Sequence, residues 1–310
     1  KVFMEVIWVL ENVKRDKLFY SKLQLTLLVA SVSLWRKYHP EHYTVIYCDN
    51  LTYDTLSKLK ILHLWHSVRK LDYPDDIDRE VFWSGCKTKI ISETNQPLLL
   101  VDHDFLIRKN IDKHLNTNVL YSYDEIESNW YPPVWDPYAK QVPFERVVDR
   151  AANVSLFYLP DPEFARKYGK KVLENHRILT KILKKLPPSK KWEISANHMI
   201  LSEQLMLKQW LVKYKIPHET LTNLVWDCTK PPHRCLEDEV KADQGIWNLK
   251  ESLLYYKHYG VEETYLKEQY HKNHIVYETE INYLRRCIIA GKLVDYDDFF
   301  NGLRKYVNEI

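Results

Sequence analysis

The sequence predicts an α/β fold in which a mostly parallel central sheet is flanked by helices. Apolar runs at 2–10, 43–48 and 97–101 have the composition of strands that are buried on both faces. Between the first two runs, residues 19–37 carry apolar side chains at helical spacing. Strands that alternate with helices along a chain indicate a parallel sheet, because the crossover between parallel strands usually contains a helix.

The same patterns extend the prediction along the rest of the chain. Residues 261–310 are charged and helical in pattern, which predicts a helical C-terminal extension that packs on the sheet or forms an oligomer surface. The other expected helices are 51–64, 82–94, 161–175 and 192–214, and the other expected strands are 66–71, 119–123, 151–160 and a short one within 216–228.

The composition is that of an ordinary globular protein. Of the 310 residues, 45% are hydrophobic and 28% are charged. The formal net charge of +3 is too small to indicate a nucleic-acid partner by itself. No apolar stretch approaches the roughly 18 residues of a membrane span, so neither a transmembrane segment nor a signal peptide is predicted. The chain begins at Lys1 without methionine, so the question whether an upstream segment has been trimmed stays open.

The cysteines favour reduced thiols and hence a cytoplasmic location. Their number is odd, at five, and no CxxC spacing occurs among them. An alternative is a small loop closed by Cys228 and Cys235 in an oxidising compartment.

The most informative stretch is 97–107, where an apolar strand is interrupted by Asp102-His103-Asp104. Unpaired charges are costly inside a protein, so the two carboxylates are expected at the end of the strand. Alternation along an extended chain places Asp102 and Asp104 on one side and His103 on the other. Two oxygen ligands on one side of a strand end suit a hard divalent cation, Mn²⁺ or Mg²⁺. The alternative is a β-turn that carries two solvated aspartates.

This acidic triplet after an apolar strand resembles the DxD motif of the GT-A glycosyltransferases. Members of that family move a sugar from a nucleotide-sugar to an acceptor, and their motif holds a metal that bridges the donor diphosphate. The resemblance implies a GT-A-like, Rossmann-type sandwich. It further implies a catalytic domain at 1–260, with a nucleotide-binding half at about 1–123 and an acceptor half at about 124–260, followed by an extension at 261–310. Only the DxD segment is specific, and no branch of the family is identified.

The resemblance also implies contacts with the nucleotide-sugar donor. Val9, Asn12 and Asp49 lie at the ends of the first two strands, where the family holds the base and the ribose. Lys87 lies on the helix before the DxD strand, where a basic residue often reaches the donor phosphate, and its spacing fits better than that of Lys89. A helix N-cap is the alternative for Asp49, and a solvated lysine is the alternative for Lys87.

Three later residues complete the implied site. Asn153 precedes a strand whose counterpart in the family approaches the donor sugar. Glu203 lies on a helix whose counterpart points an acidic residue at the reaction centre, where it would take the acceptor proton. His258 follows an apolar run and is the implied third metal ligand, which favours Mn²⁺. The alternatives are a surface glutamate for Glu203 and a structural histidine for His258.

Two segments have compositions that predict surfaces. The loop 124–141 carries Trp130, Tyr131, Trp135 and Tyr138, which predicts a wall for the acceptor or the donor sugar, or else a satellite core. Residues 166–191 hold ten lysines and arginines against the single acid Glu174. This basic segment is either a solvated helical face or a footprint for a polyanion, such as nucleic acid or an anionic lipid surface.

The sequence therefore predicts a metal-dependent glycosyltransferase that uses a nucleotide-sugar donor, with UDP as the expected nucleotide, and a glycan or polysaccharide hydroxyl as acceptor. Asp104 would bind the cation directly, and Asp102 would bind the cation or the donor ribose. One alternative is an enzyme of the same fold that glycosylates a modified nucleic-acid base through residues 166–191. Another is a module that binds a nucleotide or carbohydrate without catalysis.

Overall fold

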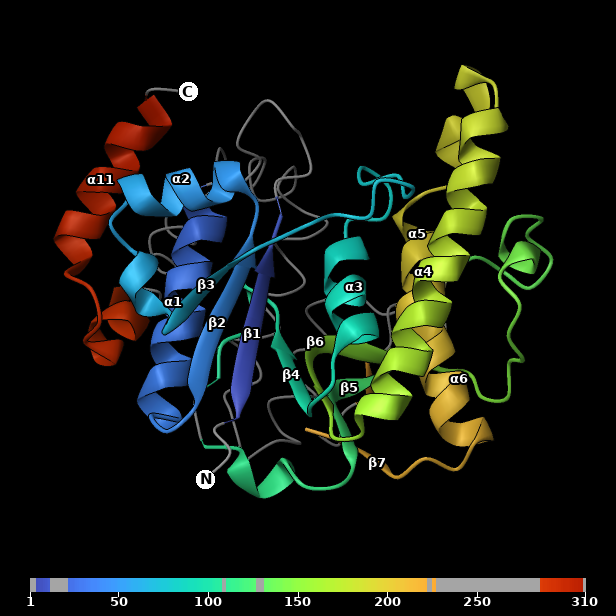
Figure 1. The fold of residues 1–310 in the computed structure, drawn as a ribbon, viewed down its shortest axis with the longest axis horizontal. Helices are drawn as coiled ribbons and strands as arrows, with labels where there is room; N and C mark the ends of the chain where they lie inside the picture. Colours follow the sequence, from blue (N-terminus) through green and yellow to red (C-terminus); the bar gives the residue numbers. More distant parts are fainter. Residues whose placement is uncertain are drawn as a thin grey trace. The chain divides into compact units, whose positions relative to one another are not determined.

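The computed structural model describes residues 4–11, 22–107, 110–126, 131–221, 225–226 and 285–308 (Figure 1). The chain divides into two compact units that interleave along the sequence. The first unit contains Lys1–Lys70, Val101–Asp112 and Leu236–Ile310, and the second contains Leu71–Leu100 and Lys113–Cys235.

The first unit contains three parallel strands in the order β3-β2-β1. They are β1 (Glu5–Leu10), β2 (Tyr43–Cys48) and β3 (Ser67–Lys70). Leu10 lies opposite Cys48, so the carboxyl ends of β1 and β2 reach the same edge of the sheet. Ligands of open parallel sheets bind at such edges.

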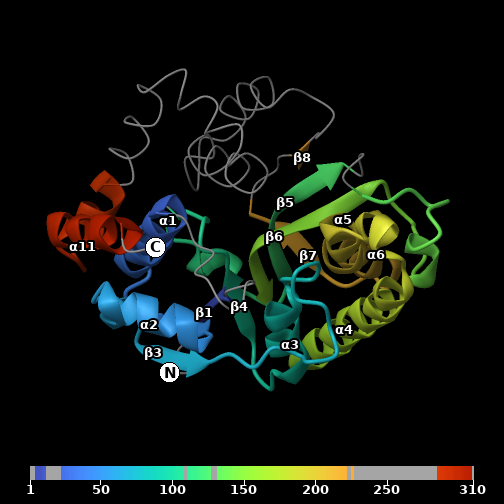
Figure 2. The same cartoon turned by 90° about the horizontal axis from the view of Figure 1, so that it is seen from above.

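Several helices accompany these strands within the described residues, including a helical segment at 285–291. Three of them carry labels in Figure 1. They are α1 (Lys22–Tyr38), α2 (Asn50–Lys58) and α11 (Tyr296–Asn308). The helix α11 lies next to α2 (Figure 2), and a Cβ atom built on Gly302 of α11 would lie 3.8 Å from Cδ2 of Leu59 at the end of α2. The C-terminal segment is fixed to this unit, since the carbonyl of Leu293 lies 2.9 Å from Nε2 of His63.

The second unit has its strands in the order β4-β6-β5-β7, and β8 also pairs with β5. The antiparallel pairing of β5 with β6 makes this part of the sheet mixed, whereas β7 and β8 run parallel to β5. The strands are β4 (Leu98–Val101), β5 (Val119–Ile126), β6 (Arg150–Leu159), β7 (His218–Thr220) and β8 (Val225–Trp226).

The helices α3 (Gly85–Glu93) and α4 (Pro162–Lys185) pack closely against each other. A Cβ atom built on Gly169 would lie 2.6 Å from the backbone nitrogen of Ser92, so only glycine allows this approach. Asp161 caps α4 by accepting a hydrogen bond from the backbone of Glu163 at 2.8 Å.

The last helical segment of this unit changes its geometry midway. It begins with α5 (Ala196–Ile200), continues as a π-helical turn at Leu201–Leu205 and ends with α6 (Met206–Lys213). All five residues of the π-helical turn are buried. Such turns insert an extra residue into a helix and occur frequently at functional sites.

The α/β fold class predicted from the sequence is confirmed, and several predicted boundaries are corrected. The helix expected at 51–64 ends at Lys58, and a separate 3₁₀ turn covers Leu62–Leu64. The helix expected to end at Asn175 runs on to Lys185, because Leu179 and Leu183 continue its buried face.

Two further boundaries differ from the prediction. The strand expected to end at Tyr123 extends to Ile126, so that Glu125 belongs to the sheet. The helix expected from Trp192 begins at Ala196, because Pro188–Glu193 forms a 3₁₀ helix. The proposed halves of the catalytic domain and the separate extension at 261–310 stay predictions.

Candidate functional site

The acidic triplet forms a turn directly after β4. All four residues of β4 are buried, and the backbone NH of Phe105 donates to the carbonyl of Asp102 at 3.1 Å. Because 102–104 is a turn, the rule that placed Asp102 and Asp104 on the same side of an extended chain does not apply. Asp104 is only 9% exposed, so the alternative of two solvated aspartates is wrong for this residue.

The chain after this turn is anchored to the first unit. The hydroxyl of Ser31 on α1 donates to the carbonyl of Phe105 at 2.7 Å and accepts from Nε1 of Trp8 on β1 at 3.1 Å. All three residues are buried, and buried hydrogen bonds of this kind are costly to break. The position of the acidic turn is thus fixed by β1 and α1.

Asp49 follows β2 and caps α2, since its Oδ1 accepts from the backbone NH of Thr52 at 2.7 Å. The alternative of a helix N-cap for Asp49 is therefore confirmed. Nucleotide binding by Asp49 stays a prediction. Burial, followed by the negative charge of Asp49, raises the pKa of the Cys48 thiol to about 12. Val9 is half-buried near the end of β1, and Asn12 lies outside the described residues.

The two carboxylates fit a hard cation by their chemistry, because both offer oxygen ligands at the end of a buried strand. No group of three histidine, cysteine or acidic side chains within the described ranges could hold a metal ion. The implied third ligand, His258, lies outside those ranges. A cation bound at Asp102 and Asp104 would therefore need ligands from another source, such as the donor diphosphate.

In the second unit, the structure brings Lys87 and Glu203 together. The ammonium of Lys87 donates to the carbonyl of Val154 at 3.0 Å and lies 3.9 Å from Oε1 of Glu203. Glu203 is 4% exposed, so the alternative of a surface glutamate is wrong. The nearby ammonium stabilises the carboxylate charge, which would be costly to bury without a partner.

The π-helical turn holds this carboxylate in place. The hydroxyl of Tyr168 on α4 donates to the backbone carbonyl of Glu203 at 2.9 Å. Burial, followed by the charge of Glu203, raises the pKa of Tyr168 well above its ordinary value. Tyr168 therefore stays a neutral donor across the physiological range and keeps its bond to the turn.

Asn153, another residue selected from the sequence, belongs to a buried polar network. Its Nδ2 donates to Oε1 of Glu125 at 2.9 Å, and its Oδ1 accepts from the hydroxyl of Ser155 at 2.7 Å. The hydroxyl of Tyr131 lies 2.9 Å from Oε2 of Glu125 and 3.0 Å from Oε1 of Gln204, close enough for a hydrogen bond to either. This network joins β5, β6 and the π-helical turn.

Sequence reasoning missed Glu125, Gln204 and Tyr131 as members of this cluster. Glu125 was assigned to a loop, because the alternation of apolar and polar residues over 121–124 breaks at this charged residue. Gln204 directly follows Glu203 and was given no role of its own. No local signal shows that Tyr131 turns inward, because its role depends on contacts distant in sequence.

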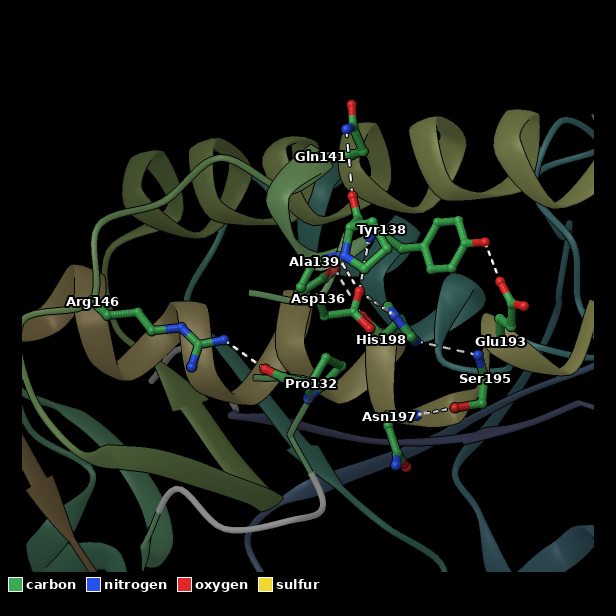
Figure 3. Close-up of polar contacts among 12 residues, drawn as sticks. Pro132, Asp136, Tyr138, Ala139, Gln141, Arg146, Glu193, Ser195, Asn197 and His198 are labelled. Carbon is green, nitrogen blue, oxygen red and sulfur yellow. Dashed lines mark hydrogen bonds and ion pairs between the residues drawn. The ribbon is translucent and has the colours of Figure 1, made fainter. Parts of the chain in front are cut away.

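The aromatic loop divides into structural and exposed residues. Tyr131 is buried, whereas Trp135 is 74% exposed, and Trp130 lies outside the described residues. The hydroxyl of Tyr138 donates to the carboxylate of Glu193, as Figure 3 shows. The sugar wall expected of this loop stays a prediction, and within the described residues only Trp135 presents an exposed aromatic ring for it.

Some basic side chains of the segment 166–191 make contacts within the protein. Arg166 donates to the carbonyl of Thr94 at 2.9 Å, and Arg177 forms an ion pair with Asp76 at 2.6 Å. The α4 part of the segment thus serves partly as a structural face. Its polyanion footprint stays a prediction. None of the described helices has the length and apolar character needed to cross a membrane.

Comparisons with known proteins identify no family for this chain. Neither the profiles of protein families nor the curated proteins give a match. Among solved structures, a galactosyltransferase called LgtC, in complex with donor and acceptor sugar analogues, is similar at 12% identity and a TM-score of 0.33. The match covers 58% of this chain and 70% of that one. A likeness this low carries no functional conclusion.

Proposed function

We propose that this chain is a metal-dependent glycosyltransferase that moves a sugar from a nucleotide-sugar, with UDP as the expected nucleotide, to an acceptor hydroxyl. The observation that carries the proposal is the meeting of Lys87, Asn153 and Glu203 in one buried polar region. These residues come from α3, β6 and the π-helical turn, which are distant in sequence. The resemblance to the GT-A glycosyltransferases implies a place for each of them at the donor or at the reaction centre.

The proposed roles of Asp102 and Asp104 concern the diphosphate of the donor. Asp104 would hold Mn²⁺ or Mg²⁺ directly, and Asp102 would hold the cation or the donor ribose. The bound cation would supply Lewis-acid neutralisation of the diphosphate leaving group. The place of Asp104 in the turn directly after the buried strand β4 supports this assignment, because ligands of α/β sheets bind at the carboxyl ends of strands.

The proposed role of Glu203 is that of a general base. As the bond between the sugar and the diphosphate breaks, the acceptor oxygen forms its bond to the sugar, and the acceptor proton passes to the Glu203 carboxylate. Lys87 would keep that carboxylate ionised before the reaction. Lys87 is also the proposed contact of the donor phosphate, because an ammonium beside the diphosphate would offset its negative charge.

The test is turnover of nucleotide-sugars, measured as hydrolysis and as transfer to a panel of glycans, with Mn²⁺ and with a chelator. We expect turnover that requires the cation and that falls more than about a hundredfold in Asp104→Ala. Asp54→Ala changes an exposed aspartate on α2 in the same unit and is the matched control. Turnover that survives both the chelator and Asp104→Ala would refute the mechanism. Tight nucleotide-sugar binding without turnover would favour the non-catalytic module.

A further inference from the structure

Two tryptophans of the second unit are exposed to an unusual degree. Trp135 is 74% exposed, Trp192 is 75% exposed, and Val134, which precedes Trp135, is 65% exposed. Single exposed apolar residues are common, but large ones on neighbouring segments indicate an interaction surface. We refer to Val134, Trp135 and Trp192 as the tryptophan surface.

Hydrogen bonds tie together the two segments that carry this surface (Figure 3). The hydroxyl of Tyr138, three residues after Trp135, donates to the carboxylate of Glu193, which directly follows Trp192. Trp192 is itself held, since its Nε1 donates to the carbonyl of Ser189 at 2.9 Å. The two tryptophans are therefore presented by segments that are bonded to each other.

The loop that bears Trp135 is fixed internally as well. Oδ1 of Asp136 accepts from the backbone nitrogens of Tyr138 and Ala139, both at 2.8 Å, and lies 3.4 Å from Nε2 of His198. A loop held by this many contacts loses little conformational entropy when its tip binds a partner. The exposed tip is thus a preorganised feature of the fold.

Lysines accompany the tryptophan surface, and the acids of the same two segments form hydrogen bonds within the protein. Glu193 accepts from Tyr138, and Asp136 is hydrogen-bonded within its own loop. The exposed lysines of these segments and of the adjoining end of α4 are Lys140, Lys184, Lys185, Lys190 and Lys191. The region therefore combines exposed indole rings with an excess of basic side chains.

We propose that the tryptophan surface and these lysines bind an anionic lipid bilayer at its interface. Indole rings prefer the level of the lipid headgroups, and lysines near an anionic membrane gain electrostatic attraction. A nucleic acid would use the lysines and could stack bases on the indoles, but it offers no apolar environment to Val134. This proposal does not depend on the proposed glycosyl transfer.

The experiment is co-sedimentation of the whole chain with vesicles of phosphatidylcholine alone and of phosphatidylcholine mixed with phosphatidylglycerol. The assay contains no nucleotide-sugar, because Trp135 also belongs to the predicted sugar wall. We expect binding to the anionic vesicles that weakens as salt is added. Trp135→Ala and Trp192→Ala should each lower the partition coefficient roughly tenfold. Lys190→Ala with Lys191→Ala should lower it about fivefold per lysine.

Matched controls lie elsewhere on the same unit. Trp83→Ala removes another exposed tryptophan, and Lys167→Ala with Lys170→Ala removes lysines from the opposite end of α4. Both controls should bind like the wild type. No binding to anionic vesicles, equal losses in the controls, or binding to duplex DNA in place of vesicles would each overturn the proposal. Circular dichroism of every variant shows whether a loss of vesicle binding comes from the substituted side chain or from unfolding of the protein.

Discussion

At the scale of single residues, the buried carboxylate of Glu203 is the side chain on which the proposed chemistry depends most. It combines 4% exposure, a lysine ammonium at 3.9 Å and a place in a π-helical turn. If Glu203 served only the fold, through its ion pair with Lys87, its replacement would change stability and not the rate of transfer by the folded protein. This difference allows a direct test of its role.

Glu203→Gln keeps the shape of the side chain and removes its ability to take a proton. We expect the rate of sugar transfer to fall by roughly 10² to 10⁴, which is the usual contribution of a positioned general base. The thermal midpoint of unfolding measures the fold independently. A variant that transfers sugar within about twofold of the wild-type rate would remove Glu203 from the mechanism.

Two buried histidines predict sensitivity to acid. Burial lowers the pKa of His176, which stacks on Phe82 with ring centroids 4.8 Å apart, to about 3. Burial, followed by the charge of His42, lowers the pKa of His39 to about 4. Both histidines bind protons in the unfolded chain near their ordinary pKa of 6.5, whereas in the folded chain they do not. The stability is therefore complete above that pH and falls as the pH decreases below it.

His176→Leu tests this linkage. Below pH 6.5 and down to about pH 4, each pH unit should remove about 1.4 kcal/mol of unfolding free energy per histidine in the wild type. The leucine variant lacks one of these two groups, so its loss per pH unit should be smaller by that amount. Denaturant titrations across this range provide the measurement, and identical slopes for the two proteins would contradict the assignment.

At the scale of elements, much of the strand pattern could be predicted from the sequence. The apolar run at 43–48 matches β2 residue for residue, and the run that begins at Pro97 contains β4. Strands buried on both faces read as nearly continuous apolar runs, and their short length favours a strand over a helix. The antiparallel pairing of β5 with β6 could not be predicted, because composition carries no information on strand direction.

The helices show where periodicity is insufficient. The many basic residues after Asn175 obscured the apolar periodicity that Leu179 and Leu183 continue. The helix was therefore expected to end at Asn175, whereas α4 ends at Lys185. The π-helical turn at Leu201–Leu205 arises from contacts such as the bond from Tyr168, which no local pattern records. The buried contacts of Glu203 could therefore not be predicted from the sequence, although its place on a helical segment could.

The contact of α3 with α4 predicts opposite effects of the same substitution at two helical glycines. Alanine is favoured over glycine in helices by about 1 kcal/mol. At Gly169, however, a Cβ atom would lie 2.6 Å from the backbone of Ser92, and such overpacking costs about 1–3 kcal/mol. Gly169→Ala should therefore lower the free energy of unfolding.

Gly302→Ala on α11 is the matched variant. Its Cβ would meet Cδ2 of Leu59 at 3.8 Å, an ordinary van der Waals contact. We expect this variant to gain about 0.5–1 kcal/mol of stability. Denaturant unfolding of both variants is the measurement, and a stabilised Gly169→Ala would show that the α3–α4 packing is looser than described.

At the scale of the whole molecule, the predicted site residues fall into two groups, one in each compact unit. The first unit contains the acidic turn and Asp49, and the second contains Lys87, Asn153 and Glu203. These positions were predicted from the order of elements together with the resemblance to the GT-A glycosyltransferases. The supporting residues Glu125, Gln204 and Tyr131 could not be found in this way, because they act through contacts that are set by packing.

The most direct test of the central claim is calorimetric titration of UDP into the protein with and without Mn²⁺. The measurement reads binding alone and so does not require the acceptor. We predict that Mn²⁺ strengthens UDP binding at least about tenfold, and that Asp104→Asn removes this gain whereas Asp54→Asn retains it. Equal UDP affinity in the wild type and Asp104→Asn, with and without the cation, would contradict the account.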